Sequence, residues 1–469
     1  MGYAPLVTRT AMLLLAAFSL LGLFRLADRV ANTQVAIAST VCTALYPVFF
    51  SQSSLAQVDL AAAGLILWGL ASFIEGQLVA AAIWFALAAV AKETAILASA
   101  ALAGWELAGM FARRTSLRQL WCEKDAPREF DSASVRKILW LAASALPLIL
   151  WYAYHYSRTG YVFGNPEFFR YNVAATLSLP RFFLALAMRI WQVVGYLHLW
   201  ILTIFTLLAM WMLSPQLEAG SEKPRITLPV QMMFYAVVVT YVLALALIGG
   251  AVLARYMLPA VPLFIIVCIS TLWRRLRYWR LAVAFVALTF VGGWFWNPFY
   301  GFSPEDNLAY RDYVVLHQDA ENYLEARYPM AQVLTAWPAS DEISRPWLGY
   351  VTRPMRIVRI EDFSLDEVLS AAAIRSEYQA ALIFSTKYEN RPAIWDRWRT
   401  WTQLKTRFFG FHRDLPPEAA AKILGGRVVF SEHRQGQWIA VIEMDRDEMQ
   451  NAQAAETIRR PPPVHSSDF

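Results

Sequence analysis

Three ionisable residues lie at the boundaries of long apolar runs in this sequence. Asp59 opens an apolar run that continues to about residue 75, and Lys92 and Glu93 separate two further runs. A carboxylate can take a proton from a hydroxyl, and a lysine ammonium can hold an anionic group such as a lipid phosphate. We expect Asp59 and Glu93 to be catalytic and Lys92 to bind phosphate. The alternative is structural, because helix N-termini favour carboxylates by about 0.3–1 kcal/mol and lysines at span ends extend to the interface.

A second candidate is the aromatic stretch between residues 155 and 183, which connects two apolar runs. Its arginines Arg158 and Arg170 suit phosphate pairing, and His155 and Tyr161 suit contact with a sugar ring. The glycines of this stretch mark turns, because they lack the spacing of a nucleotide-binding loop. An aromatic loop that rests on lipid headgroups is the alternative.

The third candidate is the segment 254–262. Arg255 is followed by Tyr256, and Pro259 and Pro262 come just after them. Prolines weaken the first turns of the next helix and can widen a cavity there. We expect Arg255 to bind phosphate and Tyr256 to contact the substrate, with extension of Arg255 to the interface as the alternative.

The histidines and cysteines give no sign of a metal site. His198 lies inside an apolar run, where a single histidine more often makes an interhelical hydrogen bond than a metal bond. His317, His412 and His433 show no ligand spacing, and no pair among the three cysteines suggests a disulfide or a zinc knuckle. The sequence therefore predicts no metal and no cofactor.

These candidates must be positioned by membrane helices. Of the 469 residues, 57% are hydrophobic and only 17% are charged. The hydrocarbon core of a bilayer is about 30 Å thick, which about 20 helical residues span. We expect an α-helical polytopic membrane protein with about ten transmembrane helices, at 11–27, 33–50, 57–75, 77–91, 93–111, 137–156, 190–213, 229–250, 256–273 and 280–297.

Lysines and arginines set the orientation. They concentrate in alternate connections, between the fifth and sixth, seventh and eighth, and ninth and tenth spans. The positive-inside bias places these loops in the cytoplasm, so both chain ends lie outside. This distribution argues against nucleic-acid binding, because the cations serve short membrane loops. We expect Asp59, Lys92, Arg158 and Arg255 to share one hollow on the outer side.

Three regions follow from the change of pattern along the chain. Residues 1–300 form the membrane region, 301–450 an extracytoplasmic α/β domain, and 451–469 a disordered tail. Helical patterns cover 306–327, 365–378 and 392–408. Alternating patterns predict strands at 332–336, 356–360 and 381–385, and a hairpin of 428–433 with 438–444.

Residues 1–300 resemble the polytopic lipid-linked-sugar glycosyltransferases, the protein O-mannosyltransferase and aminoarabinose-transferase-like family of the C-type superfamily. The resemblance implies inverting transfer of a sugar from a polyprenyl-phosphate donor, at the outer face of the inner membrane, with a periplasmic C-terminal domain. The acceptor would be a lipid, a protein or a polysaccharide. The matching features are Pro47, Ser54 and Asp59 in one block, Ala91-Lys92-Glu93-Thr94, Arg158-Thr159-Gly160, and Arg255-Tyr256-Met257-Leu258-Pro259.

One departure from the family leaves alternatives open. The family begins with a further span and an outer loop that carries its principal acidic residue, whereas no Asp or Glu precedes Asp28 here. The resemblance thus implies that the chain as given lacks that span and loop, and an inactive, truncated transferase is one alternative. A non-enzymatic membrane carrier or scaffold with an outer partner-binding domain is the other.

Overall fold

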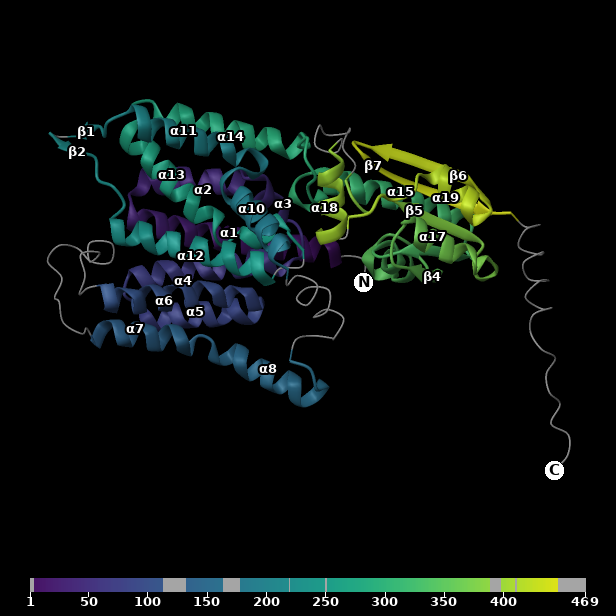
Figure 1. Ribbon diagram of the computed structural model, residues 1–469, viewed down its shortest axis with the longest axis horizontal. Helices are drawn as coiled ribbons and strands as arrows, with labels where there is room; N and C mark the ends of the chain where they lie inside the picture. Colours follow the sequence, from purple (N-terminus) through teal and green to yellow (C-terminus); the bar gives the residue numbers. More distant parts are fainter. Residues whose placement is uncertain are drawn as a thin grey trace. The chain divides into compact units, whose positions relative to one another are not determined.

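The computed structural model describes residues 4–112, 132–162, 178–218, 220–248, 251–388, 398–409 and 411–445 (Figure 1). The chain divides into two compact units. One is helical and comprises Thr8–Pro298 together with Glu305–Asn307. The other contains Leu308–Phe469, and a five-stranded sheet forms its centre.

The helical unit consists of apolar helices that mostly run antiparallel to their neighbours in sequence. In chain order its elements are α1 (Ala4–Val30), α2 (Thr33–Leu45), α3 (Pro47–Gln52), α4 (Val58–Ile74), α5 (Leu78–Ala91), η1 (Glu93–Ala95), α6 (Ile96–Ala112), α7 (Ser132–Ala143), α8 (Leu146–Thr159), α10 (Leu179–Val194), η4 (Tyr196–His198), α11 (Leu199–Met212), β1 (Leu217–Glu218), β2 (Ser221–Glu222), α12 (Leu228–Ile248), η5 (Ala254–Met257), α13 (Val261–Arg275) and α14 (Trp279–Phe295).

The predicted multi-pass helical membrane fold is confirmed. Five described helical segments are long and apolar enough to cross a membrane, and shorter apolar helices lie between them. Large apolar side chains such as Leu14, Leu207 and Leu288 are exposed on these helices. Lipid would cover them, as it does in membrane bundles. The expected number of about ten spans holds only approximately, because several helices are short or interrupted.

Three predicted spans are interrupted in the structure. The span predicted at 33–50 ends at Leu45, because Pro47 begins the separate short helix α3. The span predicted at 137–156 extends over 132–159 and is divided into α7 and α8. The span predicted at 190–213 is divided by η4, and α10 begins at Leu179, so part of the predicted outer loop is helical.

The division at η4 depends on two left-handed residues. Leu197 has φ 43° and His198 has φ 72°, a region that residues with a side chain seldom occupy. Nδ1 of His198 lies 2.7 Å from the Thr289 carbonyl oxygen on α14, which holds the turn against that helix. A Cβ at Gly293 would lie 2.9 Å from the same imidazole nitrogen, so only glycine lets α14 approach this closely.

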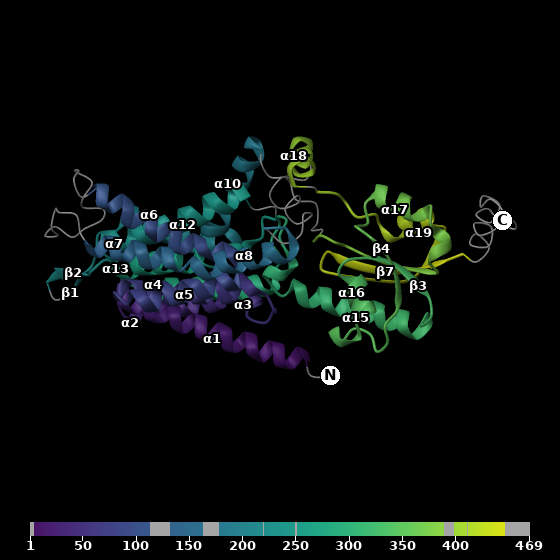
Figure 2. The ribbon, with the colours of Figure 1, turned by 90° about the horizontal axis from the view of Figure 1, so that it is seen from below.

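The α/β unit has the strand order β4-β3-β5-β7-β6, with β4, β3 and β5 parallel and β7 and β6 antiparallel. Helices α15 and α16 cover one face of the sheet, and α17 and α19 cover the other (Figure 2). Its elements are α15 (Ala309–Arg327), β3 (Gln332–Ala336), α16 (Ala339–Ser344), η7 (Pro346–Leu348), β4 (Arg356–Ile360), α17 (Leu365–Ala372), η8 (Arg375–Glu377), β5 (Ala380–Phe384), α18 (Arg399–Phe409), α19 (Pro417–Leu424), β6 (Gly426–Arg434) and β7 (Gln437–Met444), preceded by η6 (Pro304–Asp306).

The predicted C-terminal strands are confirmed to within two residues. All five residues of β5 are buried, which explains why this strand reads as a continuous apolar run. The predicted hairpin forms β6 and β7, and Gln435 and Gly436 at its turn both have positive φ, as a two-residue hairpin loop requires. The helix predicted at 392–408 is described over Arg399–Phe409, and residues 389–397 lie outside the described part of the chain.

Candidate functional site

Four of the predicted site residues, Asp59, Lys92, Arg255 and Tyr256, meet at one end of the helical unit. Helices α4 and α5 form an antiparallel hairpin, so the start of α4 and the end of α5 lie at the same end. Asp59 is in the first turn of α4, and Lys92 follows the last residue of α5. Arg255 lies in η5, which packs against α3 and α4. Residues distant in sequence are thus brought together by helix ends.

Ion pairs connect these residues. Nζ of Lys92 pairs with Oδ1 of Asp59, and Nε of Arg255 lies 3.3 Å from Oδ2 of the same carboxylate. Nη1 of Arg255 also pairs with Oε2 of Glu305. The side chains of Lys92 and Arg255 keep 14% and 16% of their exposure, whereas Asp59 keeps 6%. Asp59 is therefore buried beneath two cations that remain partly accessible.

Tyr256 is surrounded by positive charge. Nζ of Lys92 lies 3.7 Å from the centre of its ring, and the guanidinium carbons of Arg255 and Arg189 lie 5.6 and 5.7 Å from it. Cations at these distances are attracted to the face of an aromatic ring. The ring keeps three like charges close together. We call Asp59, Lys92, Arg189, Arg255, Tyr256 and Glu305 the cation cluster.

Arg189 was not singled out from the sequence, yet its side chain is fully buried. It donates to the carbonyl oxygens of Leu253, at 2.8 Å, and Ala251, at 3.0 Å. The side chain of Gln192, one turn later on α10, bonds both Arg189 and the Val252 carbonyl. Arg189 therefore fixes the backbone that leads into Arg255. An arginine inside a mostly apolar helix is the sequence signal that could have identified it.

Glu305 was also missed, because the sequence places it in the first turn of the C-terminal region. Its carbonyl oxygen accepts hydrogen bonds from Ser51 Oγ and, at 3.2 Å, from Gln52 Nε2. The next residue, Asp306, accepts a 2.6 Å hydrogen bond from the Tyr196 hydroxyl. The polar residues of α3 thus hold the chain where Glu305 reaches Arg255.

The cation cluster carries more positive than negative charge. Lys92, Arg189 and Arg255 supply three positive charges, and Asp59 and Glu305 supply two negative charges. The difference is one positive charge among partly dehydrated groups. Such a site favours an anion, because Coulomb attraction is stronger where water is scarce. A phosphate monoester or diester matches both the charge and the donors of Lys92 and Arg255.

The remaining predicted residues do not join the cation cluster. Glu93 follows Lys92 in sequence but is exposed, and it makes no hydrogen bond or ion pair within the described part of the chain. Arg158 is exposed in the last turn of α8, and Tyr161 is exposed just after it. His155 is half-buried and stacks on Trp151 at a ring distance of 6.4 Å. Arg170 lies outside the described residues.

His198 makes the interhelical contact predicted for it. Its imidazole lies against the Thr289 carbonyl oxygen, and it belongs to no metal-ligand group within the described ranges.

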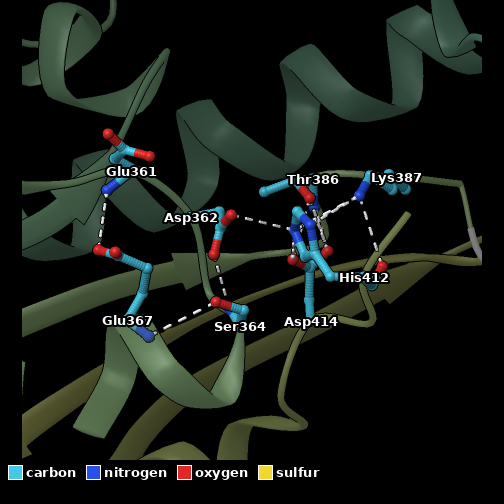
Figure 3. Close-up of polar contacts among 8 residues, drawn as sticks. All are labelled: Glu361, Asp362, Ser364, Glu367, Thr386, Lys387, His412 and Asp414. Atoms are coloured by element: carbon cyan, nitrogen blue, oxygen red, sulfur yellow. Dashed lines mark hydrogen bonds and ion pairs between the residues drawn. The ribbon is translucent and has the colours of Figure 1, made fainter. Parts of the chain in front are cut away.

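A second polar cluster lies in the α/β unit, where the parallel strands β4 and β5 end (Figure 3). Nε2 of His412 is 3.5 Å from Asp362 and 3.6 Å from Asp414, and Nζ of Lys387 lies 3.0 Å from Nδ1 of the same ring. The amide and hydroxyl of Thr386 donate to Asp414 at 2.7–2.9 Å. Burial raises the pKa of Asp414 and lowers the pKa of Lys387. These contacts connect loops at the carboxyl edge of the sheet.

Comparison with known proteins gives matches in structure only. No family model and no curated protein matches the sequence. The crystal structure of ArnT from Cupriavidus metallidurans bound to undecaprenyl phosphate matches with a TM-score of 0.48 and 13% identity, over 92% of this chain and 83% of that chain. The apo state of the same protein matches with the same TM-score and coverage and 14% identity. Function must therefore be argued from the residues of the site.

Proposed function

We propose that the protein is a membrane glycosyltransferase that moves a sugar from a polyprenyl-phosphate donor to an acceptor hydroxyl at the outer face of the membrane. The observation that carries this proposal is the cation cluster. Lys92 and Arg255 are partly accessible, held by a buried carboxylate, and located at the ends of apolar helices. A phosphate attached to a membrane lipid is an anion that can reach such a place.

In this proposal the two cations stabilise the leaving group. The bond between the sugar's anomeric carbon and the phosphate oxygen breaks, and negative charge develops on that oxygen. Nζ of Lys92 and the guanidinium of Arg255 stand ready to compensate that charge. Asp59 is buried and already paired with both cations, so we assign it a positioning role and no proton transfer. Tyr256 supports the same arrangement through its ring.

Glu93 is the carboxylate that we assign to the acceptor. It is exposed and carries no ion pair within the described part of the chain, so its oxygens are available to a hydroxyl group. The acceptor oxygen forms a new bond to the anomeric carbon on the face opposite the phosphate, and its proton passes to Glu93 and then to water. Sugar, phosphate and proton are thereby accounted for, and the configuration is inverted.

The residues around the end of α8 complete the proposal. Arg158 would approach the donor phosphate, and His155 and Tyr161 would contact a sugar. The phosphate-binding role expected of Arg170, which lies outside the described residues, stays a prediction. The cationic loops at the opposite end of the helices, with Arg274 and Arg275 in the last turn of α13, support an inner-membrane orientation with the site outside. The α/β unit would then lie in the periplasm, where a lipid, protein or polysaccharide acceptor is available.

The test is a transfer assay with the purified full chain in vesicles. The donors are polyprenyl-phosphate sugars supplied one at a time, and an envelope extract from cells without the gene supplies acceptors. We expect release of polyprenyl phosphate and labelling of an acceptor with one donor, and loss of both in Lys92→Ala and Arg255→Ala. Arg277→Ala, an exposed arginine at the opposite helix ends, is the matched control. Turnover unaffected by Lys92→Ala and Arg255→Ala would overturn the proposal.

A further inference from the structure

Three ionisable side chains are buried together in the α/β unit, away from the cation cluster. His317 and Glu321 lie one turn apart on α15, and Glu342 comes from α16. Their side chains keep 2%, 0% and 8% of their exposure. Nδ1 of His317 is 2.6 Å from Glu342 Oε2 and 3.7 Å from Glu321 Oε1. One ligand atom from each residue lies within 4.8 Å of the other two.

Glu321 is poorly compensated within the described residues, because its nearest cationic group is His317, at 3.7 Å. Neither of its carboxylate oxygens accepts a hydrogen bond, although both are inaccessible to solvent. No described lysine or arginine forms an ion pair with Glu321 or Glu342. Burial of a carboxylate that accepts no hydrogen bond is costly, and buried charges in proteins are normally closely paired or bound to a metal. The oxygens of Glu321, which accept no hydrogen bond, therefore indicate a further positive partner.

We infer that His317, Glu321 and Glu342 form a structural binding site for a divalent transition-metal ion, with zinc as the best fit. Zinc takes imidazole nitrogen and carboxylate oxygen at about 2.0–2.2 Å, and one ligand atom from each of the three residues lies within 4.8 Å of the other two, close enough to surround one ion. A neutral imidazole and two carboxylates carry two negative charges, which one divalent ion balances. Glu321 can bind through both oxygens, so that three residues supply four ligand atoms.

The surroundings favour a closed site. The His317 ring stacks on Tyr313 at 4.0 Å and meets Phe384 at 4.6 Å. With side-chain exposures of 8% or less, the ligands are nearly closed off from solvent, as in structural zinc sites, whereas catalytic sites keep an open position. The ion would connect α15 to α16, which follows β3 directly, and so would stabilise one face of the sheet.

The alternative arrangement is a proton shared between Glu321 and Glu342, beside a charged His317. It balances the same charges without a metal. Zinc content distinguishes the two arrangements, because only the metal site binds zinc stoichiometrically.

The experiment uses the full chain, purified through a tag without histidines, treated with a chelator and then supplied with zinc. We expect about one zinc ion per chain after gel filtration, by elemental mass spectrometry, and slower hydrogen exchange of α15 and α16 with zinc than without it. Glu321→Gln and His317→Ala should lose both effects. Glu418→Gln, an exposed glutamate of the same unit, is the control and should retain them.

Folding of the variants is checked without zinc, through hydrogen exchange of the buried strand β5. Zinc retained in full by a folded Glu321→Gln chain would overturn the inference. The inference would also be overturned if the parent chain bound no zinc, or if zinc did not change the hydrogen-exchange rates of α15 and α16. These two results do not depend on any variant. None of these outcomes bears on the glycosyltransferase proposal, which depends on residues of the helical unit.

Discussion

The ammonium nitrogen of Lys92 lies 3.7 Å from the centre of the Tyr256 ring while it pairs with Asp59. The lysine is thus held from two sides, by a carboxylate and by the face of an aromatic ring. A flexible lysine side chain loses much conformational freedom when it is fixed in this way. Because these contacts fix the lysine side chain before phosphate binds, they reduce the loss of conformational entropy on binding.

Replacement of the aromatic ring at position 256 should weaken the site. Tyr256→Leu removes a cation–π contact that is worth about 0.5–2 kcal/mol, so we expect transfer to fall by about 2- to 30-fold. Tyr256→Phe keeps the ring and is the matched control, with activity close to the parent. Initial rates at low donor concentration give the comparison, and equal losses in both variants would assign the effect to the hydroxyl group.

Loss of the carboxylate at position 93 should affect turnover and leave donor binding intact. Because a positioned base contributes about 10²–10⁴-fold, Glu93→Gln should lower kcat by a factor in that range. Polyprenyl phosphate should bind as tightly as before, since Glu93 has no ion pair with the cations. Glu222→Gln, at the opposite helix ends, is the control. A kcat equal to that of the parent would exclude Glu93 as the base.

Arg189 should be a stability determinant of the helical unit. Arg189→Met leaves the carbonyl groups of Ala251 and Leu253 without their donors, and each such bond to a charged group is worth about 1.5–3 kcal/mol. We expect a clearly lower midpoint of thermal unfolding in detergent, whereas Arg277→Met, at an exposed arginine, should change it little. A midpoint unchanged by Arg189→Met would show that the 251–253 segment does not need this side chain.

The orientation can be tested with single cysteines. Ser157→Cys lies at the helix ends near Lys92, and Tyr278→Cys lies at the opposite ends, where residue 278 is 62% exposed. Both substitutions are made in a chain that also carries Cys122→Ser. The other native cysteines, Cys42 and Cys268, are buried and can stay. We expect an impermeant thiol reagent to label position 157 in intact cells and position 278 only after permeabilisation. The reverse pattern would invert the topology.

The sequence predicted the fold because its signals are local. Apolar runs, Pro47 after α2 and the positive-φ turn at Gln435 and Gly436 each follow from neighbouring residues. The division of the helix at 195–198 could not be predicted, because Leu197 and His198 adopt left-handed conformations that only tertiary contacts sustain. Neighbouring residues predict where helices and strands form, whereas the packing between helices determines breaks such as this one.

The candidate site shows the same limit. Asp59, Lys92, Arg158 and Arg255 were predicted to lie together because they border apolar runs on one side. The structure places Asp59 in contact with Lys92 and Arg255, whereas Arg158 is exposed at the end of α8. Glu305 completes the cation cluster. Its ion pair with Arg255 depends on how distant segments of the chain pack, so neighbouring residues could not predict it. Similarly, His317 shows no ligand spacing with other histidines, since one of its neighbours, Glu342, comes from another helix.

Binding of a polyprenyl phosphate to the purified full chain tests the central claim most directly. Isothermal titration in detergent compares the parent with Lys92→Ala and Arg255→Ala, and with Arg277→Ala as the control. The cation cluster predicts saturable binding by the parent and the control, at least about tenfold weaker binding by the other two, and little binding of the uncharged polyprenol. Equal affinity in all four chains, or equal affinity for the polyprenol, would contradict a phosphate site at Lys92 and Arg255.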